Sequence, residues 1–125
     1  MRALYPCEDD HSLSVSDLIA PQIQVFVARR DGVALGCAAL ADMAGYGEVK
    51  SLFVDPAARG QGIARQLMAR LEAAARDRHL TVLRLETGAD LAAARALYVA
   101  CGFEICPPFG PYRASPASVF MEKPL

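Results

Sequence analysis

A short loop with two glycines joins an apolar strand pattern to a helical pattern, and it constrains the fold more than any other part of the chain. The segment from Val54 to Ala64 reads VDPAARGQGIA. It breaks the strand at Asp55 and Pro56, then places an arginine and two glycines just before the helix. The first backbone N–H groups of a helix have no intrahelical partner and lie at the positive end of its dipole. This loop is therefore predicted to hold an anion such as a phosphate.

Three residues of the loop suit this task. Gly60 and Gly62 let the main chain approach a ligand and adopt dihedral angles that a Cβ disfavours. The guanidinium of Arg59 can add a positive charge and paired hydrogen-bond donors. The dinucleotide-binding fingerprint needs a third glycine where the chain has Arg65, and the P-loop needs a Gly-Lys-Ser/Thr ending that is absent. Both are excluded, and an ordinary strand-to-helix turn is the remaining alternative.

The bulk composition predicts one soluble domain over residues 1–125, in which residues 1–23 are poorly defined. The chain is 54% hydrophobic, so it can bury one hydrophobic core. Its formal net charge is -1, so it lacks the excess of positive charge that binds nucleic acid. No apolar stretch approaches a membrane span, and the first residues lack the core of a signal peptide. We therefore expect a cytoplasmic protein without nucleic-acid or membrane partners.

The cysteines and histidines do not predict a metal or redox site. The four cysteines include no Cys-x-x-Cys pair, and His11 and His79 lie far apart in the sequence. We expect reduced cysteines that mostly serve packing, and no bound metal.

The alternation of apolar patterns predicts an α/β fold with a mixed sheet. A turn at Asp31 and Gly32 joins the first two strands of an antiparallel meander, and the helix after the glycine loop forms a crossover that can bring two strands together in parallel. Ahead of Gln24 the sequence predicts loop and a short helix around residues 16–20. The predicted strands are 24–28, 33–40, 48–54, 81–86, 103–106 and 119–123, and the predicted helices are 63–79 and 91–101.

Two motifs resemble the GNAT family of acetyl-CoA-dependent N-acetyltransferases. The loop from Arg59 to Ala64 matches the Arg/Gln-x-x-Gly-x-Gly/Ala signature, which in that family binds the coenzyme A pyrophosphate. Downstream, the family's usual last helix and next strand are matched by Ala94-x-x-Leu97-Tyr98 and Gly102-Phe103. The resemblance runs from about Gln24 to the C-terminus, whose ending is similar to that of small bacterial members. It implies flanking helices and a splayed parallel strand pair with the coenzyme in the gap.

The sequence departs from the family pattern at two places. Members usually begin with a strand and a helix, whereas no segment before Gln24 reads as that strand, so the usual first strand is predicted to be missing. Either the sequence begins inside the family's first helix, or another chain covers the exposed edge, which makes a homodimer possible. Leu91 stands where many members carry an asparagine that contacts the pantetheine arm.

Acetyl transfer to an amine needs a neutral amine, a polarised carbonyl and a proton for the departing thiolate. The resemblance assigns the proton donor to Tyr98, whose ordinary pKa near 10 keeps it protonated at neutral pH. Glu48 is similar in placement to the catalytic glutamate of histone-type members and is the predicted base. The structural alternatives are simple packing for Tyr98 and a solvated strand end for Glu48. A bulge near Phe53 and Val54 is expected to free backbone N–H groups for the carbonyl.

Three further residues are predicted to bind the acceptor. Lys50 would favour a substrate with a carboxylate, Glu86 could orient the amine or act as the base, and Tyr112 lies in a loop that is near the acceptor in related proteins. Strand alternation places Glu48, Lys50, Leu52 and Val54 on one face. Ion pairs across the sheet, Lys50 with Glu86 or Arg84 with Glu48, are the alternative.

The sequence thus predicts transfer of acetyl from acetyl-CoA to a primary amine of a small molecule or amino-acid-like substrate, by direct attack in a ternary complex. A coenzyme A binding module without turnover and a protein-amine acetyltransferase are the alternatives. The residues predicted to bind the coenzyme are Leu52, Phe53, Val54, Arg59, Gly60, Gln61, Gly62, Ile63, Ala64 and Tyr98.

Overall fold

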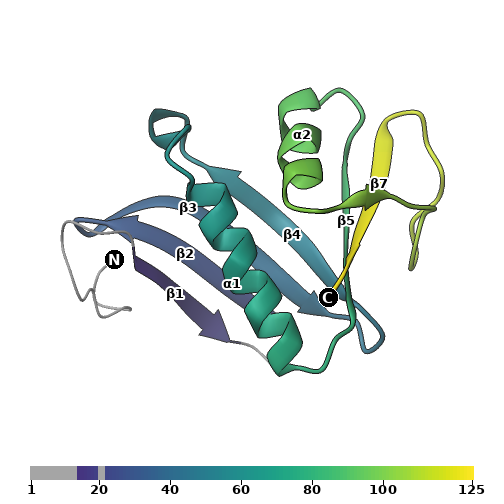
Figure 1. Ribbon diagram of the computed structural model, residues 1–125, viewed down its shortest axis with the longest axis horizontal. Helices are drawn as coiled ribbons and strands as arrows, with labels where there is room; N and C mark the ends of the chain where they lie inside the picture. Colours follow the sequence, from purple (N-terminus) through teal and green to yellow (C-terminus); the bar gives the residue numbers. More distant parts are fainter. Residues whose placement is uncertain (1–13, 20–21) are drawn as a thin grey trace.

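The computed structural model describes residues 14–19 and 22–125. They form a seven-stranded sheet in the order β1-β2-β3-β4-β5-β7-β6, with helices α1 and α2 beside it (Figure 1). This is the mixed α/β architecture that the sequence predicted. The elements are β1 (Ser14–Ile19), β2 (Ile23–Arg30), β3 (Val33–Asp42), β4 (Gly47–Val54), the 3₁₀ turn η2 (Pro56–Ala58), α1 (Ile63–Asp77), β5 (Val82–Gly88), α2 (Ala92–Ala100), β6 (Glu104–Ile105) and β7 (Ser118–Pro124).

The first strand corrects one expectation of the sequence analysis. Ser14–Ile19 is a strand, not a helix, and it pairs antiparallel with β2 from Ser14 opposite Arg29 to Ile19 opposite Gln24. The prediction that the family's usual first strand is missing is not overturned, because in the family a helix follows that strand. Only positions 20–22 separate β1 from β2. The serine-rich segment has no strong strand pattern of its own, and its backbone groups are satisfied by the neighbouring strand, which local propensity does not reveal.

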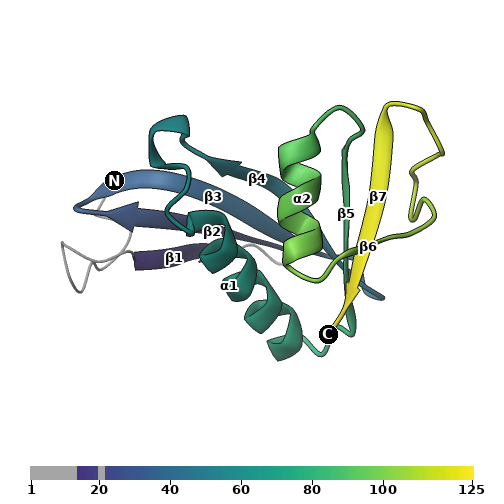
Figure 2. The same cartoon turned by 45° about the horizontal axis from the view of Figure 1, so that its top comes forward.

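The two parallel strands meet at one end only. β4 and β5 pair at Gly47 with Leu83 and at Glu48 with Arg84, and then they diverge towards their carboxyl ends (Figures 1 and 2). Gly47 permits this contact, because a Cβ there would lie 2.8 Å from Leu40 Cδ1 and 3.0 Å from Leu83 Cδ2. The predicted splayed strand pair is confirmed.

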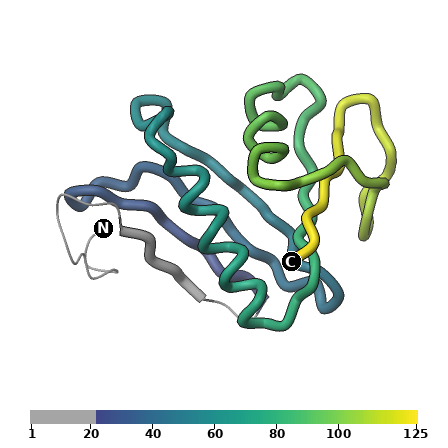
Figure 3. The backbone as a smooth tube through the Cα atoms, viewed as in Figure 1, coloured from purple at the N-terminus to yellow at the C-terminus, as the bar shows by residue number. Residues whose placement is uncertain are grey.

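Helix α1 covers the meander and forms the crossover to β5. The chain passes from β4 through the glycine loop into α1, which runs back across the sheet before it turns into β5 (Figure 3). The helix buries one stripe of apolar side chains against the sheet, as its spacing predicted. These side chains are Ile63, Leu67, Met68, Leu71, Ala74 and Ala75.

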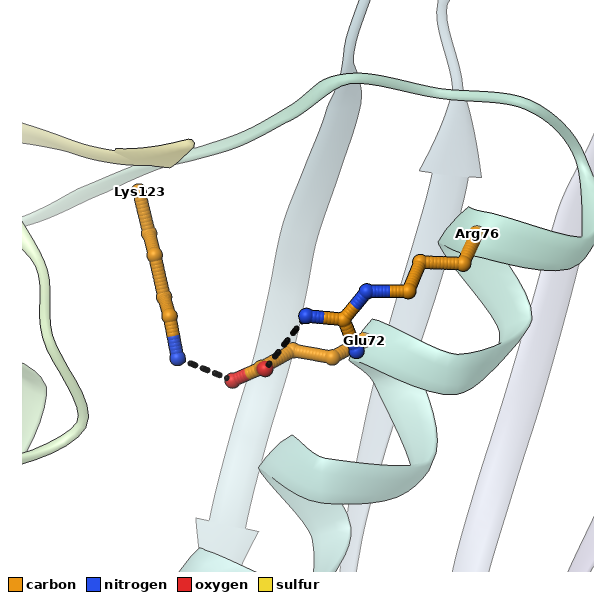
Figure 4. A network of polar contacts seen from close by, with 3 residues as sticks. All are labelled: Glu72, Arg76 and Lys123. Atoms are coloured by element: carbon orange, nitrogen blue, oxygen red, sulfur yellow. Dashed lines mark hydrogen bonds and ion pairs between the residues drawn. The ribbon is translucent and has the colours of Figure 1, made fainter. Parts of the chain in front are cut away.

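A charged network joins the last strand to α1 (Figure 4). Lys123 Nζ on β7 lies 2.8 Å from Glu72 Oε2, and Arg76 Nη2 lies 3.7 Å from Glu72 Oε1. Glu72 thus bridges its own helix and a strand from the far end of the chain. Each partly exposed ion pair of this kind contributes little to stability. Burial of the apolar side chains of α1 therefore provides most of the free energy that holds the helix against the sheet.

Replacing Leu71 by alanine tests this attachment. Leu71 has no exposed surface, so the change leaves a cavity and is expected to lower the free energy of unfolding by about 2 to 5 kcal/mol. Urea denaturation followed by circular dichroism measures this difference. Gln66→Ala on the exposed side of the same helix is the control and should stay within about 0.5 kcal/mol of wild type. Equal stability of the two variants would contradict the packing described.

Candidate active site

A groove of about 830 Å³ opens where β4 and β5 diverge. Its walls come from the end of β4, the glycine loop, the start of α1 and the facing side of α2. Most of the predicted coenzyme-binding residues line it together, although they come from segments more than thirty positions apart. The lining residues are Leu52, Phe53, Val54, Ala58, Arg59, Gly60, Gly62, Ile63, Ala64, Arg65, Asp90, Leu91, Ala92, Ala93, Ala94, Leu97 and Tyr98.

The glycine loop has the backbone that an anion cradle needs. Gly60 and Gly62 have φ angles of 81° and 76°, and no atom outside the adjoining residues lies within 4 Å of a Cβ built on either. A side chain there would meet open space but would force a left-handed conformation. Gly62 also caps α1, so the N–H groups of the first helical turn point into the loop. These residues fit a phosphate-bearing ligand.

Gln61 occupies a different place from its neighbours. It is not among the residues that line the groove, and its Oε1 accepts a hydrogen bond of 2.6 Å from Arg30 Nη1 at the end of β2. The sequence analysis missed Arg30, because no local pattern connects two residues 31 positions apart. This bond links the β2–β3 hairpin to the glycine loop and places the positive charge of Arg30 beside that loop.

A β-bulge interrupts β4 just before the groove. Ala39 pairs with Lys50 and Cys37 with Phe53, so β4 has one more residue than β3 in this interval. Ser51 takes a φ of 56°, which is rare for a residue with a side chain. The bulge was expected near Phe53 and Val54, and the structure places it slightly earlier in the strand.

The bulge also overturns the alternation that the sequence predicted for β4. Glu48 and Lys50 share one face, since their charged groups lie 3.9 Å apart. Leu52 and Val54 do not share that face, because they pack against the same core as Val49. One extra residue shifts the two-residue period of a strand, so every later side chain changes sides.

Tyr98 lies in the wall of the groove on α2. It is 8% exposed, and its ring packs edge-on against Phe103 with 5.9 Å between the centroids. Burial raises the pKa of Tyr98 above its ordinary value of 10.0, and the neighbouring Cys101 thiol adds to the shift. The phenol is therefore protonated at neutral pH and faces a cavity. Leu91, at the position of the family's asparagine, lines the same cavity.

Glu48 is buried at the point where the strands diverge. Only 3% of the residue is exposed, so the alternative of a solvated strand end is wrong. Tyr112 Oη donates a hydrogen bond of 2.6 Å to Glu48 Oε2, the oxygen that also lies 3.9 Å from Lys50 Nζ. The hydrogen bond to Glu48, with smaller contributions from burial and nearby charge, raises the pKa of Tyr112 to about 12. The structure brings these three predicted residues together.

Glu86 and Arg84 on β5 have other partners. Glu86 is exposed, and its Oε2 accepts a hydrogen bond of 2.6 Å from Ser118 Oγ. Arg84 Nε lies 3.2 Å from Glu122 Oε1. Within the described residues, neither of the ion pairs expected across the sheet, Lys50 with Glu86 or Arg84 with Glu48, is formed. Glu48 and Arg84 are paired in the sheet, but the Glu48 carboxylate is engaged by Tyr112 and the Arg84 guanidinium by Glu122.

An aromatic cluster closes the Glu48 side of the sheet. Phe109 packs edge-on against Tyr46, Tyr112 and Phe120, with centroid distances of 5.4, 5.3 and 5.8 Å. The Arg84 guanidinium lies over the Tyr46 ring at 4.9 Å. The cluster fixes the loop that carries Tyr112 to the β3–β4 hairpin. The sequence analysis predicted Tyr112 as an acceptor-binding residue but did not predict this cluster.

Comparisons with known proteins agree with this geometry. Residues 2–103 match the acetyltransferase (GNAT) family model. An IAA acetyltransferase of Azospirillum brasilense is 50% identical over 124 residues, covering 98% of this chain and 81% of that protein. The uncharacterized N-acetyltransferase YsnE of Bacillus subtilis is 35% identical over 128 residues, covering 100% of this chain and 85% of that protein. The chain therefore belongs to the GNAT family and is an acyltransferase.

Solved structures confirm the fold. A candidate acyl-CoA N-acyltransferase from Klebsiella pneumoniae superposes with a TM-score of 0.85 at 35% identity, covering 90% of this chain and 97% of that one. An IAA acetyltransferase from Bacillus cereus has a TM-score of 0.77 at 17% identity, covering 91% and 100%, and so supports the fold alone. Within the described residues, no helix is long and apolar enough to cross a membrane, and no three His, Cys, Asp or Glu side chains are grouped to hold a metal ion.

Replacing Gly62 by alanine tests the cradle. The left-handed backbone is expected to lower the free energy of unfolding by about 1 to 2 kcal/mol and to weaken coenzyme A binding, because the first N–H groups of α1 move. Thermal denaturation and titration calorimetry measure the two effects. Gly45→Ala is the control, since Gly45 lies in open space without a left-handed φ. Unchanged coenzyme affinity in Gly62→Ala would contradict a role of this loop in binding.

Proposed function

We propose that the protein transfers acetyl from acetyl-CoA to an amine of a small molecule, by direct attack within a ternary complex. One observation carries the proposal. A single groove joins a phosphate-binding loop, the free edge of a bulged strand and the protonated phenol of Tyr98. Donor binding, carbonyl polarisation and proton donation are the three tasks that the reaction needs there.

The loop side of the groove suits the pyrophosphate of coenzyme A. Backbone N–H groups around Gly60 and Gly62 would bind its oxygens, and the Arg59 guanidinium would add charge. The pantetheine arm would then lie between β4 and α2. In the part of the chain that the structure describes, the edge of β4 beyond Glu48 forms no further pairs with β5. Backbone N–H groups around Phe53 and Val54 are thus the candidates to polarise the thioester carbonyl.

The proton transfers can be assigned to two residues. The neutral amine attacks the carbonyl carbon, the new C–N bond forms and the C–S bond breaks. The amine proton passes to Glu48, directly or through water, and the departing thiolate takes the phenol proton of Tyr98. Glu86, which is exposed and bonded to Ser118, is the weaker candidate for the base.

Two observations bear on the identity of the acceptor. Lys50 lies beside Glu48, and its side chain is 45% exposed, so it would favour an acceptor that carries a carboxylate. The name of the Azospirillum relative supplies IAA as a second candidate, given that half of the aligned residues are identical. Acceptors that carry a carboxylate and IAA should therefore be tested in the same set of substrates.

A thiol-release assay with acetyl-CoA tests the proposal against small amines, amino acids, IAA and a lysine-containing peptide. We expect turnover with at least one small amine and coenzyme A binding in calorimetry. Turnover with the peptide alone would favour protein-amine acetylation. Binding without turnover across the panel would favour a coenzyme-binding module, and absence of binding would overturn all three.

Tyr98→Phe tests the general acid. The variant keeps the ring packing but loses the proton, so we expect kcat to fall by about 10²-fold while coenzyme A affinity changes little. Because the pKa of Tyr98 lies above 10.0, this proton is retained at neutral pH and is lost only as the pH rises beyond that value. Stopped-flow or steady-state thiol release measures the rate. Val99→Ala, at an exposed position of the same helix, is the control. A rate equal to wild type would remove Tyr98 from the reaction.

A further inference from the structure

The carboxylate of Glu48 is held from one side. Within the described residues both of its polar contacts, from Tyr112 Oη at 2.6 Å and Lys50 Nζ at 3.9 Å, engage Oε2. A short bond from a neutral phenol to a buried carboxylate is a strong one. It restricts rotation of the carboxylate and directs Oε1 away from the phenol.

Tyr112 is itself held by the aromatic cluster. Its ring lies 5.3 Å from Phe109 and 5.6 Å from Phe120, and Phe109 packs against Tyr46. The cluster joins the β6–β7 loop, the β3–β4 hairpin and β7. These ring contacts therefore hold the loop in place relative to Glu48, although the loop contains no regular secondary structure around Tyr112.

Gly110 makes this packing possible. Its φ is 58°, and a Cβ built there would lie 2.6 Å from Tyr46 Oη, with the next ring atom, Cζ, at 3.9 Å. Any side chain would both strain the backbone and collide with one hydroxyl group. The close approach of Tyr46 to the loop therefore depends on glycine at this position.

We propose that Tyr112 is a positioning residue, which orients the Glu48 carboxylate so that Oε1 meets the acceptor amine, and that Gly110 sets the place of Tyr112 by admitting the Tyr46 hydroxyl. The inference rests on the proposed role of Glu48 as the base. Tyr112 itself transfers no proton. It donates one hydrogen bond throughout the working pH range, while Glu48 gains and loses the proton of the amine.

The charges around this pair act in a consistent direction. Lys50 faces Glu48, whereas Glu86 and Tyr46 act on Tyr112 and raise its pKa further. The Arg84 charge lies over the Tyr46 ring and is bonded to Glu122. Tyr112 is thus expected to remain a donor until the solution is strongly alkaline.

Titration of tyrosinate absorbance tests the contact without any activity. In wild type, the transition that Tyr112→Phe removes is expected at about pH 12. In Glu48→Gln it should move down towards 10.0, because the hydrogen bond to the carboxylate, which is the largest cause of the raised pKa of Tyr112, and the carboxylate charge are both lost. An unmoved transition in Glu48→Gln would overturn the contact and with it the proposal.

Kinetics test the positioning. Tyr112→Phe keeps the ring but loses the hydrogen bond to a charged group, so we expect kcat/KM to fall by about tenfold or more, with an unchanged KM for acetyl-CoA. The loss should appear in kcat and in the KM of the amine, because the hydrogen bond orients the carboxylate towards the acceptor. A purely structural role would lower the fraction of folded protein and leave the kinetic constants of the folded molecules in place.

The steric part of the proposal has its own compensating variant. Gly110→Ala should reproduce the effect of Tyr112→Phe on kcat and on the KM of the amine, and Gly45→Ala in the facing hairpin should match wild type. Tyr46→Phe combined with Gly110→Ala removes the atom nearest to the new Cβ and should recover part of the loss. Thermal denaturation of each variant confirms that it is folded. Absence of recovery in a folded double variant would overturn the role given to Tyr46.

The outcomes separate this inference from the proposed function. A wild-type rate in Glu48→Gln would show that Glu48 is not the base, which overturns this inference but leaves acetyl transfer itself in place. A large loss in Glu48→Gln, together with unchanged kinetic constants in Tyr112→Phe, would overturn the positioning role alone.

Discussion

The brief pairing of β4 with β5 is the constraint on which the rest of the structure depends. Two parallel pairs, at Gly47 with Leu83 and at Glu48 with Arg84, hold the strands together at one end. Beyond them the strands separate, and the buried stripe of α1 holds the β4 side of the sheet in place. A closed sheet would have used the edge of β4 for hydrogen bonds to β5. The opening instead leaves a groove beside the part of β4 that forms no described pairs with β5.

The bulge at Ser51 divides β4 into two functional parts. Before it, Glu48 contacts Tyr112 of the aromatic cluster and Lys50 lies beside Glu48, on the side proposed for the acceptor. After it, Leu52 and Val54 pack on the core and line the groove proposed for the coenzyme. One inserted residue therefore lets a single strand present polar groups to one reactant and apolar contacts to the other. The unusual φ of Ser51 is consistent with strain retained at a site of this kind.

Much of the fold was predictable from local sequence. The meander, the α1 crossover, α2 and the last strand follow from hydrophobic periodicity and from turn residues such as Asp31 and Gly32. The first strand was not predictable, because the serine-rich segment from Ser14 pairs with β2 and lacks a pattern of its own. The proposals that the chain is a single domain and that it forms a homodimer stay predictions.

The sequence by itself determined the family, through the loop from Arg59 to Ala64 and the motif around Tyr98. These signals are local, since a loop that ends in a helix N-terminus carries its anion-binding chemistry within a few residues. Only the tertiary structure decided the rest of the site. The phenol of Tyr112 meets Glu48 from 64 positions away, and Arg30 meets Gln61 from 31. Such contacts depend on strand divergence and one inserted residue, and neither leaves a periodic trace in the sequence.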